Sequence, residues 1–170
     1  MVNVQYNLSD IDEQIASCKR CELYKYATRA VPGEGNPKSR VMFIGEGPGY
    51  WEDQKGTPFC GPSGKLLDEL LQSIKLERKD VFIGNVVKHR PPQNRDPLPN
   101  EIEACSIWLD KQIKIIDPKI IVTLGRFSMT KFFPGEFISR IHGTSRMISW
   151  GDKRLMIMPM YHPAAALRNG

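Results

Sequence analysis

Residues 40–49 read RVMFIGEGPG. The apolar run at 41–44 stops at a loop with three glycines and a proline, which is typical of a buried strand entering a sharp turn. Similar apolar runs at 81–87, 120–125 and 155–158 predict three more strands.

Segments with helical spacing of apolar residues separate these strands. They predict helices at 7–15, 66–74, 100–116 and 128–132. Ser9 is expected to cap the first helix, and Asn100 with Glu103 the third. The segment 135–151 is expected to be irregular. The alternation favours an α/β fold with a mostly parallel four-stranded sheet covered by helices.

The composition fits one globular domain and excludes disordered or fibrous classes. The chain has 170 residues, of which 41% are hydrophobic and 25% charged, and no internal repeat. No stretch approaches the ~20 apolar residues of a membrane span, and the first nine residues lack a signal-peptide pattern. We therefore expect an intracellular, cytoplasmic protein without membrane contact. A net charge of +5 permits a polyanionic partner.

The carboxyl ends of the predicted strands carry polar residues. They are Glu46, Asn85, Arg126 and His162. Ligands of open α/β sheets bind at this edge, so we expect the chemistry there. The glycines at 45–49 do not form a dinucleotide fingerprint, because Tyr50 stands where its third glycine belongs.

Cysteines offer a second kind of site. Cys18 and Cys21 have the spacing that lets two thiolates reach one metal centre, and Cys105 faces inward on a predicted helix. A fourth ligand would have to be Cys60 or His89. Each cysteine is otherwise a small buried side chain.

Five motifs in order resemble the family 4 uracil-DNA glycosylases. They are CKRC (18–21), GEGPG with the acidic pair at 52–53, GTPFCG (56–61), NVVKHRPPQNR (85–95) and HP (162–163). The resemblance spans about residues 18–168. It implies a three-layer α/β/α sandwich, with residues 1–170 as a single domain on which a cluster-ligand segment of about 1–37 packs.

The resemblance also implies a [4Fe–4S] cluster held by four cysteines. Three of them match Cys18, Cys21 and Cys105, whereas His89 stands at the fourth position. Histidine ligates iron in Rieske centres, so a Cys3His cluster is expected. Zinc on the same donors is the alternative metal, and Cys60 is the weaker alternative for the fourth ligand.

The resemblance implies a uracil pocket with three central residues. Phe59 stacks on the flipped base. Asn85 pairs with O4 and N3–H of uracil and mismatches cytosine. His162 donates to O2 as negative charge builds on the leaving base.

Further pocket roles follow from the same resemblance. Glu46 places or polarises the attacking water and completes the catalytic set with Asn85 and His162. The backbones of Gly45 and Gly47 shape the pocket. Glu52 closes it against the thymine methyl group, and Asn94 holds the water or a sugar phosphate.

Basic residues are expected to contact DNA phosphates. Those in the loop after the second strand and in the irregular segment are Lys88, Arg90, Arg95, Arg140, His142 and Arg146. Residues 164–168 look like an intercalating loop, with Leu167 as a wedge and Arg168 beside it.

The sequence thus predicts a monomeric, monofunctional hydrolase that releases uracil from DNA and leaves an abasic site. Two alternatives stay open. One is a catalytically weak iron–sulfur DNA-binding protein of the same fold, and the other is a glycosylase for a different deaminated base.

Overall fold

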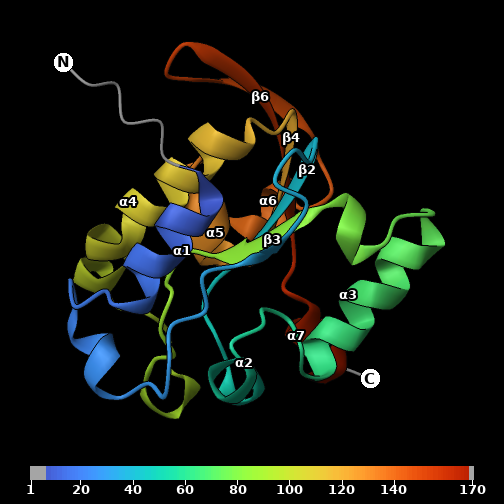
Figure 1. Cartoon of the computed structure of the whole chain (residues 1–170). Helices are drawn as coiled ribbons and strands as arrows, with labels where there is room; N and C mark the ends of the chain where they lie inside the picture. The colour runs from blue at the N-terminus through green and yellow to red at the C-terminus, as the bar shows by residue number, and fades with distance from the viewer. Residues whose placement is uncertain (1–6, 169–170) are drawn as a thin grey trace, which may run out of the picture.

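A mixed sheet forms the centre of the computed structural model, which describes residues 7–168 (Figure 1). Residues 1–6 and 169–170, which were assigned to the same domain, lie outside the described residues. Within the described range the sheet has six strands in the order β1-β3-β2-β4-β6-β5. The strands are β1 (Glu34–Gly35), β2 (Val41–Gly45), β3 (Phe82–Asn85), β4 (Ile120–Leu124), β5 (Arg146–Trp150) and β6 (Lys153–Met160).

The predicted α/β class with a mostly parallel sheet is confirmed, but the count of four strands is wrong. The four predicted strands are β2, β3, β4 and β6, and they run parallel to one another. The missed strands, β1 and β5, pair antiparallel at the two edges. β1 has two residues, too few for a periodic signal, and β5 lies within the segment expected to be irregular.

Helices cover both faces of the sheet. They are α1 (Leu8–Ala16), α2 (Tyr50–Lys55), α3 (Pro62–Ser73), α4 (Pro99–Ile116), α5 (Arg126–Thr130), α6 (Ile138–Ile141) and α7 (Pro163–Arg168). Three short 3-10 helices are η1 (Glu22–Lys25), η2 (Arg78–Asp80) and η3 (Pro92–Asn94). α1 and α4 lie on one side of the sheet, and α3 and α7 lie on the other (Figure 1).

Both predicted helix caps are wrong. Asn7, not Ser9, caps α1, because its side-chain oxygen accepts the Asp10 amide at 3.0 Å while the Asp10 carboxylate accepts the Asn7 amide. α4 begins at Pro99, whose fixed φ suits the first helical turn. Glu101 therefore takes the reciprocal position expected of Glu103 and accepts the Leu98 amide at 2.7 Å.

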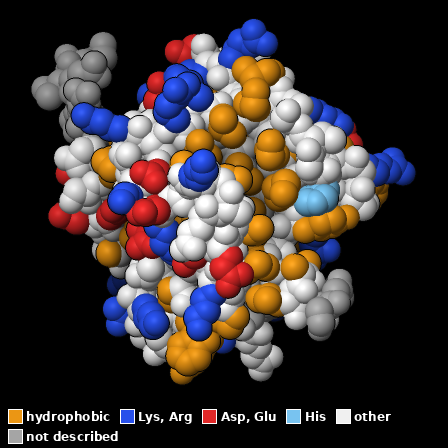
Figure 2. Space-filling model, turned by 90° about the vertical axis from the view of Figure 1, so that its right-hand side faces the viewer, with side chains coloured by type: hydrophobic (Ala, Val, Ile, Leu, Met, Phe, Trp, Pro, Cys, Tyr) orange, Lys and Arg blue, Asp and Glu red, His pale blue; other side chains and the backbone are white. Residues whose placement is uncertain are grey.

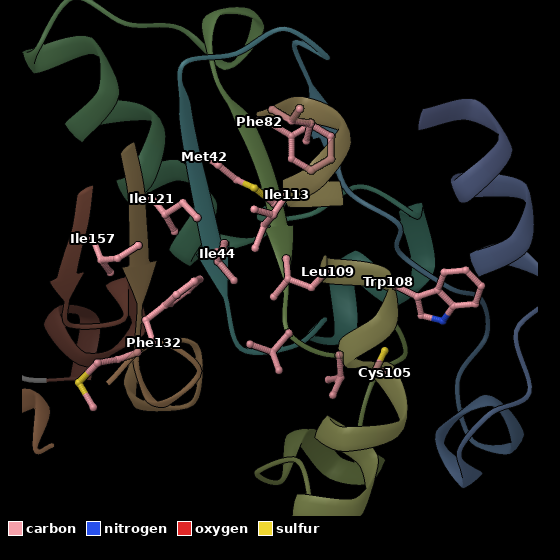
Figure 3. Packing of buried hydrophobic residues seen from close by; sticks show 14 of the residues in the cluster. Met42, Ile44, Phe82, Cys105, Trp108, Leu109, Ile113, Ile121, Phe132 and Ile157 are labelled. Carbon is pink, nitrogen blue, oxygen red and sulfur yellow. The ribbon is translucent and has the colours of Figure 1, made fainter. Parts of the chain in front are cut away.

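Strand alternation divides the core into two clusters. Side chains from one face of the sheet pack against α4 (Figure 3); they include Met42, Ile44, Ile121 and Ile157, which meet Leu109 and Ile113. Phe43, Ile83 and Val122 point to the opposite face and pack with Leu67 and Leu71 of α3. The two clusters hold the four parallel strands in place, and with them the edge where they end.

The outer side of α3 is partly apolar. Leu70 and Ile74 are 52% and 61% exposed. Figure 2 shows hydrophobic side chains spread across this face of the molecule, with lysines and arginines around them. No helix within residues 7–168 is long and apolar enough to cross a membrane.

Candidate active site at the carboxyl edge of the sheet

A cavity of about 630 Å³ lies at the carboxyl edge of the parallel strands. The chain leaves β2 toward β3 on one side of the sheet and leaves β4 toward β6 on the other, so a crevice opens between β2 and β4, where such sheets bind ligands. The residues singled out from the sequence that line it are Glu46, Gly47, Glu52, Phe59, Asn85, Asn94, Arg95, Arg126, His162 and Arg168.

Asn85 ends β3 and is 2% exposed. Its Oδ1 is buried and has no hydrogen-bond partner. A Cβ atom at Gly45 would lie 2.3 Å from this oxygen and 2.6 Å from the Phe59 ring, so only glycine fits at position 45. A buried amide oxygen without a partner is costly, and here it borders a cavity that can admit the missing donor.

One ring nitrogen of His162 is hydrogen-bonded to the backbone, and the other is left for a ligand. Its Nδ1 accepts the Ala164 amide in the first turn of α7 at 3.1 Å. Burial lowers the pKa of His162, and Arg168 acts in the same direction while Glu52 opposes it. The ring is therefore neutral at pH 7 and carries its proton on Nε2, which leaves one N–H donor for a ligand.

Glu46 follows β2 and reaches across to the loop after β4. Its Oε1 accepts the Phe127 amide at 3.1 Å. Gly125 has φ +108°, and a Cβ atom there would lie 2.3 Å from the same oxygen. Burial raises the pKa of Glu46, the Phe127 hydrogen bond opposes this, and Asp96 adds to it. The carboxylate is thus a better proton acceptor than an exposed glutamate.

Phe59 belongs both to the core and to the cavity wall. The residue is 5% exposed, packs with the α3 side of the sheet, and has φ +51°, which is uncommon for a residue other than glycine. Its ring stacks on His162 with centroids 5.6 Å apart and planes 27° apart.

Glu52 joins the two loops that border the cavity. Its Oε1 accepts the amides of Cys60 at 2.9 Å and Gly61 at 3.1 Å, and its Oε2 accepts the Gly49 amide at 3.1 Å. Because both oxygens are occupied by backbone amides, Glu52 shapes the cavity by fixing these loops.

The rim of the cavity carries the arginines expected at DNA. Arg90 donates to Asn94 Oδ1 at 2.7 Å and lies over the Tyr50 ring. Arg95 is bound in a bidentate pair to Glu101, the acidic residue at the start of α4. The Glu101 carboxylate therefore partly neutralises the charge of Arg95, which leaves less of it for a DNA phosphate.

One expected DNA contact is wrong, and one expected loop is a helix. Lys88 is fully buried and donates to the Asn85 carbonyl at 2.9 Å and to Gln112 Oε1 at 2.7 Å, so it cannot reach a phosphate. The segment 164–168 is not a loop, because it forms helix α7. Leu167 projects from that helix and is 49% exposed.

Three cysteines gather on the α4 side of the sheet. Cys18 and Cys21 pack against the cluster that contains Cys105, and Trp108 donates its indole N–H to Cys18 Sγ at 3.2 Å. Burial raises the pKa of Cys105 to about 11, and the nearby Cys21 and Cys18 add to this shift. The donors are soft and close together, which suits a thiolate-bound group.

His89 does not complete this group in the structure. Its ring is buried beside Asp53; burial lowers the pKa of His89 and the Asp53 carboxylate opposes the shift. The preceding residue, Lys88, donates its backbone N–H to the Cys105 sulfur. The His89 backbone thus lies next to the cysteines. Among the described residues, no three side chains of His, Cys, Asp or Glu are placed so that they could together hold a metal ion.

Comparison with known proteins decides the family. A family model described as the uracil DNA glycosylase superfamily matches residues 32–170. A type-4 uracil-DNA glycosylase of Sulfurisphaera tokodaii is 52% identical over an alignment of 169 residues that covers 96% of this chain and 77% of the relative. The chain belongs to the uracil DNA glycosylase superfamily.

Other members of the superfamily differ in how much of the chain they match. A type-4 uracil-DNA glycosylase of Archaeoglobus fulgidus is 48% identical over 95% of this chain and 83% of its own length. A type-5 uracil-DNA glycosylase of Thermus thermophilus is 31% identical over 61% of this chain and 54% of its own length. The resemblance drawn from the motifs is confirmed.

Some cavity residues of this superfamily member were missed or left without a role. Arg126 and Asp96 line the cavity and form an ion pair with each other. Ile138 and Ala165 come from segments read as irregular or as a loop. Arg126 follows a predicted strand, which was a usable signal, whereas nothing in the local sequence places Asp96 beside it.

Glu46→Gln is expected to stabilise the protein near neutral pH. Because the pKa of Glu46 is raised in the fold, ionisation lowers stability as pH rises through the ordinary pKa and the raised one. Glutamine keeps the acceptor for Phe127 without the charge. The melting temperature should exceed that of the wild type at pH 7, and the difference should shrink at pH 4.

The exposed Glu69→Gln on α3 is the matched control and should leave the melting temperature within error at both pH values. A Glu46→Gln protein that melts below the wild type at pH 7 would contradict the assigned cost of this buried carboxylate.

Proposed function

We propose that this chain hydrolyses the N-glycosidic bond of deoxyuridine in DNA, releasing uracil and leaving an abasic site. The observation that carries the proposal is the buried, unpartnered Asn85 Oδ1 in a cavity that also presents Phe59, His162 and Glu46. Support comes from the relatives that are named type-4 uracil-DNA glycosylases.

Asn85 reads the base edge. Its amide nitrogen donates to uracil O4 and its Oδ1 accepts N3–H, so both amide groups are used at once. Cytosine presents an amino donor in place of O4 and no N3 proton, which mismatches both atoms. Phe59 offers an aromatic face for the flipped ring.

His162 and Glu46 divide the chemistry between leaving group and nucleophile. As the C1′–N1 bond breaks, its electron pair moves onto uracil, and the neutral His162 stabilises the charge at O2 through Nε2–H. Glu46 holds the attacking water and accepts its proton as the water oxygen bonds to C1′. Its negative charge also stabilises the oxocarbenium-like transition state.

DNA is held by the rim around this cavity. Arg95 and Arg168, which line the cavity, and Arg90, which is bound to the lining residue Asn94, supply positive charge for phosphates. Leu167 on α7 is exposed and positioned to enter the vacated base stack. Every residue of the proposed site comes from one chain, so we assign the activity to a monomer. We propose that the protein acts on DNA inside the cell.

An iron–sulfur cluster is proposed on Cys18, Cys21 and Cys105, with His89 as the fourth ligand. The three thiols lie together on the α4 side of the sheet, which supports the three cysteine ligands. The His89 ring lies beside Asp53 in this structure and would have to turn toward the cysteines to bind the cluster. When bound, the cluster would cross-link the N-terminal segment to α4.

Loss of the base-reading amide of Asn85 or of the hydrogen-bond donor of His162 should remove activity. Asn85→Ala and His162→Ala are each expected to lower single-turnover release of uracil from a single-uracil oligonucleotide by about 10²-fold or more. The measurement uses anaerobically purified protein. Asn100→Ala, an exposed asparagine on α4, is the control and should match the wild type.

Two other outcomes identify the alternatives. Tight binding of uracil-containing DNA without base release would contradict the enzyme and indicate a cluster-bearing DNA-binding protein. Release of hypoxanthine or xanthine at rates similar to uracil would indicate a glycosylase of broader range.

The cluster is tested by its composition. Wild-type protein purified without oxygen should contain about four iron and four sulfide per chain. His89→Ala should lower both, His89→Cys should keep them, and Cys60→Ser should leave them unchanged. About one zinc and no sulfide would indicate the zinc site, and full iron in His89→Ala would contradict the fourth ligand.

A further inference from the structure

Arg78 reaches from η2 to the loop that carries Phe59. Its guanidinium donates from Nη1 to the Pro58 carbonyl at 2.9 Å and from Nη2 to the Phe59 carbonyl. Two further N–H groups bind acids, with Nε on Asp68 at 2.6 Å and Nη1 also on Glu34 at 2.8 Å. The Arg78 side chain is 26% exposed and lies outside the cavity lining.

The two carbonyls lie on opposite sides of the Phe59 Cα atom. The Pro58 carbonyl belongs to the peptide plane before Phe59, and the Phe59 carbonyl belongs to the plane after it. The angles φ and ψ of Phe59 are rotations of these two planar units about one Cα atom. Hydrogen bonds to both carbonyls therefore fix both angles together.

Phe59 needs such support because its backbone is strained. Its φ of +51° lies in the left-handed region, where residues other than glycine persist only when their surroundings hold them. The start of α3 packs closely against the Phe59 carbonyl, since a Cβ atom at Gly64 would lie 1.6 Å from the Phe59 oxygen. Glu52 binds the next two amides, those of Cys60 and Gly61.

The backbone angles of Phe59 decide where its ring lies in the cavity. The ring stacks on His162 and lies beside Gly45, which also borders the Asn85 oxygen. Relaxation of φ to the ordinary negative range would swing the Cα–Cβ bond and move the ring out of this position.

We propose that Arg78 is a positioning residue for base recognition: it fixes the peptide planes on both sides of Phe59 and so sets the ring against the flipped base. This inference rests on the proposed function, in that the ligand of the Phe59 face is uracil. Arg78 touches neither the base nor the reacting atoms and acts only through Phe59.

A purely structural role for Arg78 predicts a different result. If the ion pairs with Asp68 and Glu34 were its whole contribution, removing either acid would have the same kind of effect as removing Arg78. Asp68→Ala leaves the bonds to the Pro58 and Phe59 carbonyls in place and is therefore the matched control.

The experiment measures inhibition by free uracil, kcat/KM for uracil release and affinity for uracil-free single-stranded DNA. Arg78→Gln is expected to weaken uracil inhibition and lower kcat/KM, each by about 10- to 100-fold, with affinity for uracil-free DNA unchanged within twofold. Arg78→Lys keeps the charge for its acidic partners but lacks the planar fork, so it should fold and show the same loss. Asp68→Ala should stay within about twofold of the wild type for all three quantities.

A double-mutant cycle tests whether Arg78 acts through Phe59. In a Phe59→Ala background, Arg78→Lys should change uracil inhibition by less than about twofold. Independent, multiplied losses would overturn the inference, as would a folded Arg78→Lys protein with wild-type uracil inhibition.

Failure of the proposed function gives a different result. A wild-type protein that neither binds nor releases uracil contradicts that function. Amide hydrogen exchange of peptides covering 58–61 then tests the positioning role of Arg78 without reference to uracil. Faster exchange in Arg78→Lys than in Asp68→Ala supports the claim that Arg78 fixes the Phe59 loop, and equal rates overturn that claim.

Discussion

The parallel alignment of β2, β3, β4 and β6 is the constraint on which the rest of the structure depends. It brings Glu46, Asn85 and His162 to one edge, although they are separated by up to 116 residues of sequence. The hydrogen bond from the Phe127 amide to Glu46 joins the segments after β2 and β4, at the point where these two connections diverge. Two apolar clusters, one on each face, keep the strands in register and so keep the cavity in shape.

Unfavourable features of the chain concentrate in this cavity. Asn85 has an unpaired buried oxygen, Glu46 holds a carboxylate whose pKa is raised by burial, and Phe59 has a strained backbone. Each lowers stability in the free protein, and each has a role toward the base or the attacking water in the proposed mechanism. Such a distribution is expected where a fold sacrifices stability for a preorganised site.

The sequence was a good guide to central strands and a poor one to edges and long-range partners. The runs at 41–44 and 120–124 are buried on both faces and read as continuous apolar segments, whereas β5 alternates and carries the exposed Arg146 and Met147. Motifs identified Asn85, Phe59 and His162 at the cavity, but not Asp96 or Ile138. They did not reveal that Lys88 is buried, because its acceptor Gln112 lies 24 residues away on α4, nor that His89 faces Asp53.

The central claim is that the buried amide of Asn85 selects the base. The most direct measurement compares single-turnover base release from two oligonucleotides that differ only in uracil or cytosine at one position. A site built to hydrogen-bond the uracil edge should favour uracil by about 10⁴-fold or more, since cytosine leaves buried polar groups unpaired. Similar release of both bases would contradict the account.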